Sequence, residues 1–187
     1  MQEVYARSYE DMLSIDHEIA QHHIDTHAHM VLVKQKLRRM RTEWLLKIKE
    51  EVIKQLKVGF IKLVHQAEWI ANVVPIPRDG IVKMCVDLRD LNKACPKNDF
   101  PLPRIDVLVD SVAGNALMSF IDGFPGYNQI KMAPKDMTKT NVTMEWKIYC
   151  YTVMPFGLKN EEATYQRMAT ALLHDMMHNE LMYILMT

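Results

Sequence analysis

The sequence predicts an α+β fold. Segments whose apolar residues recur at helical spacing are interleaved with paired runs of β-forming residues, without the regular strand–helix–strand alternation of an α/β fold. Of the 187 residues, 49% are hydrophobic. That content is enough to bury the core of one ordinary domain, or of two small lobes that share a core.

The first forty residues predict little regular structure. Residues 1–33 show no sustained apolar period and are expected to form a linker or N-terminal extension, with one short helix near residues 9–19. A basic stretch, VKQKLRRMR, follows at 33–41. The linker's histidines allow a zinc site as an alternative, although structural zinc sites usually include cysteine and a defined scaffold. These histidines are His22, His23, His27 and His29.

A helix is expected over residues 42–58. Apolar side chains recur there at helical spacing, at Leu45, Ile48, Val52 and Leu56. Thr42 is the expected N-cap, and Gly59 can adopt the left-handed conformation that ends many helices.

Residues 69–88, WIANVVPIPRDGIVKMCVDL, predict a β-hairpin. Two runs rich in β-forming residues flank an Arg-Asp-Gly turn at 78–80. Pro75 and Pro77 have no backbone N–H to donate, so the first run is expected at a sheet edge or as an irregular strand.

The middle of the chain combines a loop, a short helix and two strands. The proline-rich stretch at 95–104 should be extended, and a short helix is expected at 103–112, ended by Gly114. ALMSFID, at 116–122, is expected to be a buried strand, and YNQIKMA, at 127–133, a second strand of nearly alternating pattern.

The last part predicts a hairpin and a helix. TNVTMEW at 140–146 and IYCYTVM at 148–154 are expected to pair. The final helix should begin at Asn160, with Glu161 and Glu162 in its first turn, where the helix dipole favours acidic side chains.

Composition excludes several classes of protein. The 23 basic and 23 acidic side chains balance, so any nucleic-acid contact must come from local basic clusters. Three cysteines without a CxxC pair argue against a disulfide scaffold and favour a reducing, intracellular compartment. No apolar run is long enough to span a membrane, and the N-terminus lacks the apolar region of a secretory signal.

Asp122 is the first candidate for chemistry. It ends the apolar run at 116–122 and precedes a Gly-Phe-Pro-Gly turn, which would present its carboxylate at the rim of a sheet. A hard cation such as Mg²⁺ prefers such oxygen ligands. An Asp-Gly pair also begins many ordinary turns, so this segment alone leaves both interpretations open.

Two further groups are candidates for binding. The Pro-Phe-Gly turn in MPFGLKN, at 154–160, could bring backbone N–H groups near a phosphate or a base pair, or it could be an ordinary strand-to-helix turn. Arg78, Lys83 and Arg89 lie on or beside the predicted hairpin and could bind phosphates, although most surface cations are simply solvated.

Taken in order, these segments resemble one family. KMCVDLRDLNKACPKNDFPLPRID, FIDGFPGYNQI, YCYTVMPFGLKN and ATYQR are similar to the reverse transcriptases of gypsy-type LTR retrotransposons, plant members above all. The resemblance runs from about residue 33 to residue 183. It implies the fingers and palm of a right-hand polymerase, without a thumb and truncated before the palm's catalytic hairpin.

The same resemblance implies a division of the chain. The reverse transcriptase domain would cover 34–187, with an N-terminal extension at 1–33. The fingers would comprise about 34–97 and 130–160, and the palm about 98–129 and 161–187.

It also implies roles for residues near the active site. Asp122 would be the first metal-binding catalytic aspartate, and Tyr127 the aromatic residue that senses the sugar 2′ position of the nucleotide. Phe156 and Gly157 match the turn beside the nascent base pair. Gln166, in the following helix, would face the primer–template.

In the fingers, the resemblance implies contacts with phosphates. Lys83 and Arg78 match positions that grip the incoming triphosphate. Arg89 and Asn92 belong to the same motif and are expected to act structurally or on the template strand. The implied partners are an RNA or DNA primer–template and a deoxynucleotide.

The implied reaction is attack by a primer 3′-hydroxyl on the α-phosphate of a deoxynucleotide, assisted by two Mg²⁺ ions. One aspartate cannot hold two such ions, and the family supplies further carboxylates from a Tyr-x-Asp-Asp hairpin. This chain instead reads Tyr183-Ile184-Leu185-Met186-Thr187. We therefore expect it to be catalytically inactive.

A frameshift after Ile184 would explain the replacement. Leu-Met-Thr can be encoded as TTG ATG ACN or CTG ATG ACN, and either sequence contains GAT GAC, which encodes Asp-Asp, two nucleotides further on. A genomic sequence without Asp-Asp in the shifted frame would contradict this hypothesis. Glu161 and Glu162 also depart from the family, which usually has small residues there, and two carboxylates near the primer–template would repel phosphate.

Three functions remain open from the sequence. The chain is an RNA-directed DNA polymerase domain by descent, without a complete metal site; or a non-catalytic nucleic-acid-binding module that keeps the basic fingers surface; or a pseudogene product without a stable fold. The expected location is intracellular, in cytoplasmic virus-like particles or the nucleus. Oligomeric state is not predicted.

Overall fold

The computed structural model describes residues 8–78, 81–98, 104, 106, 109, 110, 113 and 126–174. Several expected features lie outside the described residues. They are most of the short helix at 103–112, the strand at 116–122 with Asp122, and Tyr183 with the residues that follow it.

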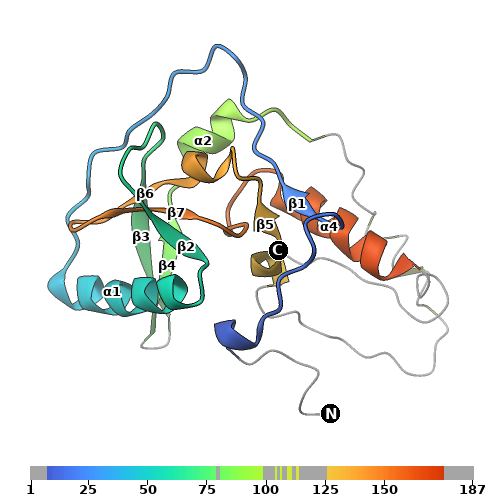
Figure 1. Cartoon of the computed structure of the whole chain (residues 1–187), viewed down its shortest axis with the longest axis horizontal. Coiled ribbons are helices and arrows are strands. Elements are labelled where there is room, and N and C mark those ends of the chain that lie inside the picture. Colours follow the sequence, from blue (N-terminus) through green and yellow to red (C-terminus); the bar gives the residue numbers. More distant parts are fainter. Residues whose placement is uncertain are drawn as a thin grey trace.

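A five-stranded sheet covered on one face by helix α1 (Thr42–Lys57) forms the first part of the fold (Figure 1). The strand order is β2-β7-β6-β3-β4. These strands are β2 (Ile61–Val64), β3 (Ala71–Arg78), β4 (Ile81–Val86), β6 (Val142–Thr143) and β7 (Ile148–Tyr151). The predicted hairpin of β6 and β7 is confirmed.

Helix α1 packs on the sheet through the apolar spacing that predicted it. Ile48 and Val52 are fully buried against Val73 and Val82 of the sheet, and burying such a side chain contributes about 1.5–3 kcal/mol. The expected N-cap is wrong. Arg41 holds the N-cap position and no side chain caps the helix, so Thr42 is its first residue.

The C-terminal end of α1 agrees with the prediction. Gly59 follows the helix with a φ of 79°, a conformation that costs glycine little because it has no Cβ.

The predicted hairpin of β3 and β4 is confirmed, and its pairing explains the two prolines. β3 pairs with β4 from Val73 to Arg78, but with β6 only at Ala71 and Asn72. Within the described residues, Pro75 and Pro77 therefore lie on a part of β3 whose second edge has no partner strand. A missing N–H costs no ladder hydrogen bond there.

The second part of the fold lies around helix α4 (Glu161–Leu172) and a short parallel pair, β1 (Gln21–His22) with β5 (Lys131–Met132). Helix α2 (Arg89–Ala94) joins its core. The structure also describes 3₁₀ helices at Tyr9–Asp11, Gly126–Gln129 and Met137–Thr140. The core contains Ile24, Leu91, Ile130, Met132, Met154, Leu158 and Met168.

Two expectations for this part have different outcomes. Helix α4 begins as predicted, with Asn160 as N-cap and two acidic side chains in the first turn. The strand expected at 127–133 is largely wrong, because Gly126–Gln129 form a 3₁₀ helix and only Lys131 and Met132 are extended. A nearly alternating pattern over so few residues does not distinguish a strand from a tight turn.

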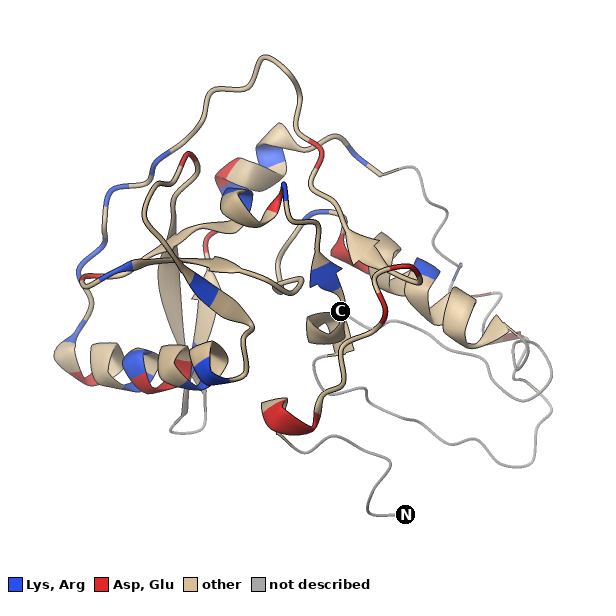
Figure 2. Cartoon of the chain, viewed as in Figure 1, with Lys and Arg blue, Asp and Glu red and all other residues tan. Residues whose placement is uncertain are grey.

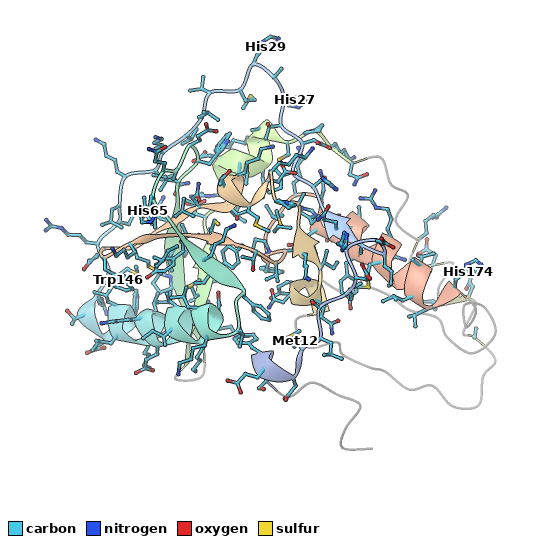
Figure 3. The ribbon with its side chains drawn as sticks, in the orientation of Figure 1. Met12, His27, His29, His65, Trp146 and His174 are labelled. Carbon is cyan, nitrogen blue, oxygen red and sulfur yellow. The ribbon has the colours of Figure 1, made fainter. Side chains whose placement is uncertain are left out.

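The N-terminal segment packs along both parts of the fold. Its backbone exchanges hydrogen bonds with Gln129, Ala133, Ala94 and Ile70. His22 is buried, whereas His27 and His29 lie on the outer arc of the segment (Figure 3). The predicted domain boundaries stay predictions. None of the described helices combines the length and the apolar character that a membrane span requires.

Candidate nucleic-acid interface

One face of strand β4 packs toward α1. Val82 and Met84 pack in the core beneath α1. Because side chains alternate along a strand, Lys83 and Cys85 occupy the opposite face. Cys85 lies close enough to Tyr127 to contribute to the raised pKa of that tyrosine. Exposed Lys83 therefore shares a strand face with Cys85, whose charge acts on Tyr127.

Tyr127 and Phe156 form an aromatic pair beside this face. Their ring centroids are 5.9 Å apart and the ring planes are tilted by 45°. Phe156 is 56% exposed, whereas burial, followed by the negative charge of Glu161, raises the pKa of Tyr127 to about 12. The pair thus combines a fixed, neutral tyrosine with an open aromatic surface, on which a base or sugar can pack.

The backbone next to Tyr127 leaves no room for a side chain. A Cβ on Gly126 would lie 2.6 Å from the hydroxyl oxygen of Tyr165, which projects from helix α4. Glycine at this position therefore lets the 3₁₀ helix that contains Tyr127 approach α4 closely.

The Pro-Phe-Gly turn is fixed by a side chain of α2. Asn92 donates through Nδ2 to the Gly157 carbonyl at 2.7 Å and accepts from the Lys159 N–H at 3.0 Å. Gly157 has a φ of 97°, which glycine adopts without strain. Lys159 also donates through Nζ to the Cys95 carbonyl at 2.7 Å. These contacts join the turn to the middle of α2 and to the residue that follows it.

Glu161 binds the N–H groups of the same turn. Its Oε2 accepts from the Gly157 N–H at 2.7 Å and from the Leu158 N–H at 3.1 Å. Burial raises its pKa to about 7, against the lowering effect of these two hydrogen bonds. The N–H groups that the sequence suggested for a phosphate or base pair are thus occupied by a carboxylate.

This contact was missed in the sequence, although it had a signal. Glu161 lies four residues after Gly157, a spacing that allows a first-turn carboxylate to reach backwards to N–H groups that precede the helix. Only its helix-dipole role and its repulsion of phosphate were expected.

Arg89 is held by a buried carboxylate. Its Nε and its terminal nitrogen donate to the two oxygens of Asp87, both at 2.7 Å. The hydrogen bond and the charge of Arg89 hold the pKa of Asp87 below its usual value. Arg38 donates to the same carboxylate at 3.3 Å. The expectation that Arg89 acts structurally or on a template strand therefore has a structural basis, while its contact with a substrate stays a prediction.

The remaining predicted site residues have different placements. Arg78 is the last residue of β3 and pairs with Ile81; only its backbone is described. Gln166 is 6% exposed, so its side chain is packed inside the second part of the fold. Asp122 lies outside the described residues. The structure therefore brings together Tyr127, Phe156 and Gly157, and leaves the metal ligand untested.

The described residues give no test of a two-metal site, because Asp122 and residues 175–187 lie outside them. Within the ranges that the structure describes, no three His, Cys, Asp or Glu side chains are grouped so that they could hold a metal. At the positions where the resemblance expects paired aspartates, the sequence has Leu185 and Met186. An alkyl group and a thioether are poor ligands for Mg²⁺, which prefers oxygen.

Comparison with protein families and curated proteins agrees with this geometry. Residues 77–185 match the family model for reverse transcriptase (RNA-dependent DNA polymerase). An RNA-directed DNA polymerase homolog from Oenothera berteroana is 35% identical over 94 residues, or 50% of this chain and 66% of that protein. The retrovirus-related Pol polyprotein from transposon 412 of Drosophila melanogaster is 33% identical over 88 residues, or 47% of this chain and 7% of the polyprotein.

Solved structures show the same fold. Native prototype foamy virus protease-reverse transcriptase superposes with a TM-score of 0.70 at 20% identity, over 90% of this chain and 24% of that one. The foamy viral protease-reverse transcriptase in complex with an RNA/DNA hybrid superposes with a TM-score of 0.68 at 17% identity. The match covers 91% of this chain and 24% of that one. The predicted α+β fold of reverse transcriptase fingers and palm is thereby confirmed.

These matches cover less than two thirds of the length of each relative. The family model itself covers more than half of this chain. Together with the fold, it shows that the chain belongs to the reverse transcriptase (RNA-dependent DNA polymerase) family.

Proposed function

We propose that this chain provides the fingers and part of the palm of a gypsy-type retrotransposon reverse transcriptase, of the kind found in plants. Relatives in transposon polyproteins of fly and fission yeast support the retrotransposon origin. The Oenothera relative supports the plant affinity. The three unpaired cysteines suit an intracellular location, in cytoplasmic virus-like particles or in the nucleus.

The proposed activity is binding of an RNA or DNA primer–template, with a deoxynucleotide at the growing end. One observation carries it: Tyr127 pairs with the exposed ring of Phe156, and exposed Lys83 shares a strand face with Cys85, whose charge acts on Tyr127. A phosphate requires a cation, and a base or sugar requires an aromatic surface. The described residues offer both.

We further propose that this chain does not catalyse nucleotidyl transfer. Two-metal catalysis of phosphoryl transfer needs carboxylates that bridge or flank both ions. Leu185 and Met186 supply none, and Asp122 alone has too few oxygens for two ions. The chain is then a nucleic-acid-binding module that retains the binding face of the family without its chemistry.

Binding is tested with a fluorescein-labelled RNA–DNA hybrid, titrated with protein at several salt concentrations and followed by anisotropy. Affinity should fall as salt rises, because phosphate contacts release counterions. Lys83→Ala should reduce the salt slope, the steepness with which the logarithm of the binding constant falls with the logarithm of salt concentration, by about 1. Phe156→Ala should weaken binding roughly five- to a hundredfold, with little change in slope, because it removes stacking.

The matched control is Lys57→Ala, which removes an exposed cation from α1, on the opposite face of the sheet. It should leave affinity and slope close to those of the wild type. Binding that does not respond to salt, or that responds equally to the loss of Lys57 and Lys83, contradicts the proposed face. A cooperative thermal melt is expected of the same sample, whereas a broad melt would favour a chain without a stable fold.

A further inference from the structure

The basic stretch at 33–41 is fastened to the fold by two amide side chains. Gln35 accepts from the N–H of Asn72 at 3.0 Å and from its Nδ2 at 3.2 Å. Asn72, which is 1% exposed, also donates to the Lys36 carbonyl at 2.8 Å and accepts from the Arg38 N–H at 3.0 Å. The backbone at Arg38 is therefore positioned by a buried group and is not a loose linker.

This position brings Arg38 to the carboxylate that holds Arg89. The Asp87 side chain is 2% exposed. Its Oδ2 accepts from the terminal nitrogen of Arg89 at 2.7 Å and from that of Arg38 at 3.3 Å. Because both nitrogens bind one oxygen, the two guanidinium groups lie next to each other, although they are 51 residues apart in the sequence.

Both arginine side chains remain largely open to solvent. The side chain of Arg89 is 75% exposed and that of Arg38 is 56% exposed. Arginine has five N–H donors. Asp87 uses two of those on Arg89 and one of those on Arg38. Two neighbouring cations therefore share one buried anion and keep donors that point away from it.

The charge around the pair favours an anionic partner. The nearby acid Asp90 accepts from Lys93 at 3.2 Å and from Gln35 at 3.0 Å, so its charge is already balanced. Arg38 and Arg89 together carry one positive charge more than Asp87. Lys and Arg also line the segment that leads into α1 (Figure 2), so the pair lies in a locally basic region of a chain that is neutral overall.

We propose that Arg38 and Arg89, held side by side by Asp87, form a clamp that binds one phosphodiester group of a nucleic-acid strand. Two adjacent guanidinium forks match the oxygens of a phosphate better than two mobile lysines do. This inference rests on the proposed function, because it adds a second contact to the same nucleic acid. Arg38 comes from the N-terminal segment, which thereby joins the binding surface.

The clamp is tested in the hybrid-binding assay. Arg38→Ala leaves Asp87 paired with Arg89, so the fold should survive. Its affinity for the hybrid should fall roughly five- to thirtyfold and its salt slope by about 1. Arg38→Lys should restore the slope but only part of the affinity, because it keeps the charge and loses the fork. The matched control is Arg39→Ala, an exposed neighbour, which should change affinity by about twofold or less.

A second variant separates the clamp from simple charge. Asp87→Asn makes the protein one charge more positive, so a general electrostatic attraction predicts tighter binding. The clamp predicts weaker binding, because the two guanidinium groups lose the anion that keeps them together. A thermal melt of each variant shows whether it is folded.

The outcomes separate the two proposals. A wild-type chain that does not bind the hybrid overturns both the clamp and the proposed function. A wild-type chain that binds, with Arg38→Ala unchanged or no weaker than Arg39→Ala, overturns the clamp alone. Tighter binding by Asp87→Asn also overturns it. Competition by polyglutamate that equals competition by single-stranded DNA would indicate an acidic protein partner instead, and overturns the nucleic-acid assignment.

Discussion

Asn92 and Gly157 are 65 residues apart in the sequence, and the Asn92 side-chain amide donates to the Gly157 carbonyl at 2.7 Å. The same side chain accepts from the Lys159 N–H. One residue of a six-residue helix thereby fixes the turn that carries Phe156. The position of the exposed aromatic ring depends on a contact between α2 and a loop that precedes α4.

Asn92→Ala should destabilise the protein by roughly 1–3 kcal/mol, since two hydrogen bonds are lost and each contributes about 0.5–1.5 kcal/mol. Urea unfolding measures the difference. Lys93→Ala, which changes an exposed neighbour on the same helix, is the control and should stay within about 0.5 kcal/mol of the wild type. Equal effects of the two variants would mean that the Asn92 contacts add no stability.

Gly126→Ala should cost roughly 1–3 kcal/mol, because the new methyl group would overlap the Tyr165 hydroxyl and force a shift. Tyr165→Phe removes the atom that lies 2.6 Å from the added Cβ. In a double-mutant cycle by urea unfolding, the alanine should therefore cost less in the Tyr165→Phe background. An additive cycle would show that overlap with the hydroxyl is not the cause, since ring carbons of residue 165 still lie 3.0 and 3.2 Å from the added Cβ.

His22 should make stability fall in acid. Burial, with smaller effects from His23 and Arg167, lowers its pKa to about 4, and its Nδ1 lies 2.9 Å from the Thr164 hydroxyl. A depressed pKa favours the neutral form in the folded state. The contribution of His22 is therefore complete above about pH 6.5 and is lost as the pH falls toward 4, by about 3 kcal/mol in total.

His22→Gln should remove this loss, while His65→Gln, at an exposed position, should retain it. Urea unfolding at several pH values between 4 and 8 provides the comparison. A wild type and a His22→Gln variant with parallel curves would contradict the assigned pKa.

Glu161 should make stability fall as the pH rises, which is opposite to the effect of His22. Its pKa is raised to about 7, chiefly by burial, so the neutral form is favoured in the folded state. This contribution to stability is complete below about pH 4.5 and is lost as the pH rises through 7. Glu161→Gln keeps an oxygen that can accept from the Gly157 and Leu158 N–H groups, and it should be more stable than the wild type at pH 8, by roughly 1–3 kcal/mol.

The two groups predict a recognisable pattern in the unfolding curves. Between pH 4.5 and 6.5 the effects of His22 and Glu161 oppose each other, so the wild-type stability should change little. His22→Gln should then lose stability as the pH rises, and Glu161→Gln should gain it. Glu145→Gln, at an exposed position, is the control and should follow the wild type.

The sequence predicted elements whose periodicity is decided locally. The spacing of Ile48 and Val52 predicted α1, the turn at 78–80 predicted the β3–β4 hairpin, and Asn160 predicted the start of α4. The strand expected near Tyr127 was largely wrong, because the close approach of Gly126 to Tyr165 is a tertiary contact that no local pattern reveals.

The candidate site was predicted by residue type but not by contact. The resemblance suggested Lys83, Tyr127, Phe156 and Gly157, of which Tyr127 and Phe156 form an aromatic pair next to Gly157. It could not show that Glu161 occupies the N–H groups of the turn, or that Arg38 reaches Asp87 from a segment expected to be a linker. Both contacts depend on how distant segments pack, and Asp122 is outside the described residues.

The most direct test of the account combines binding and chemistry in one experiment. The wild-type chain is mixed with a labelled DNA primer on an RNA template, deoxynucleotides and Mg²⁺ or Mn²⁺, and the products are separated on native and denaturing gels. We expect a salt-sensitive complex on the native gel and an unextended primer on the denaturing gel. A primer extended by this chain would contradict the proposed loss of catalysis, and the absence of any complex would contradict the proposed binding.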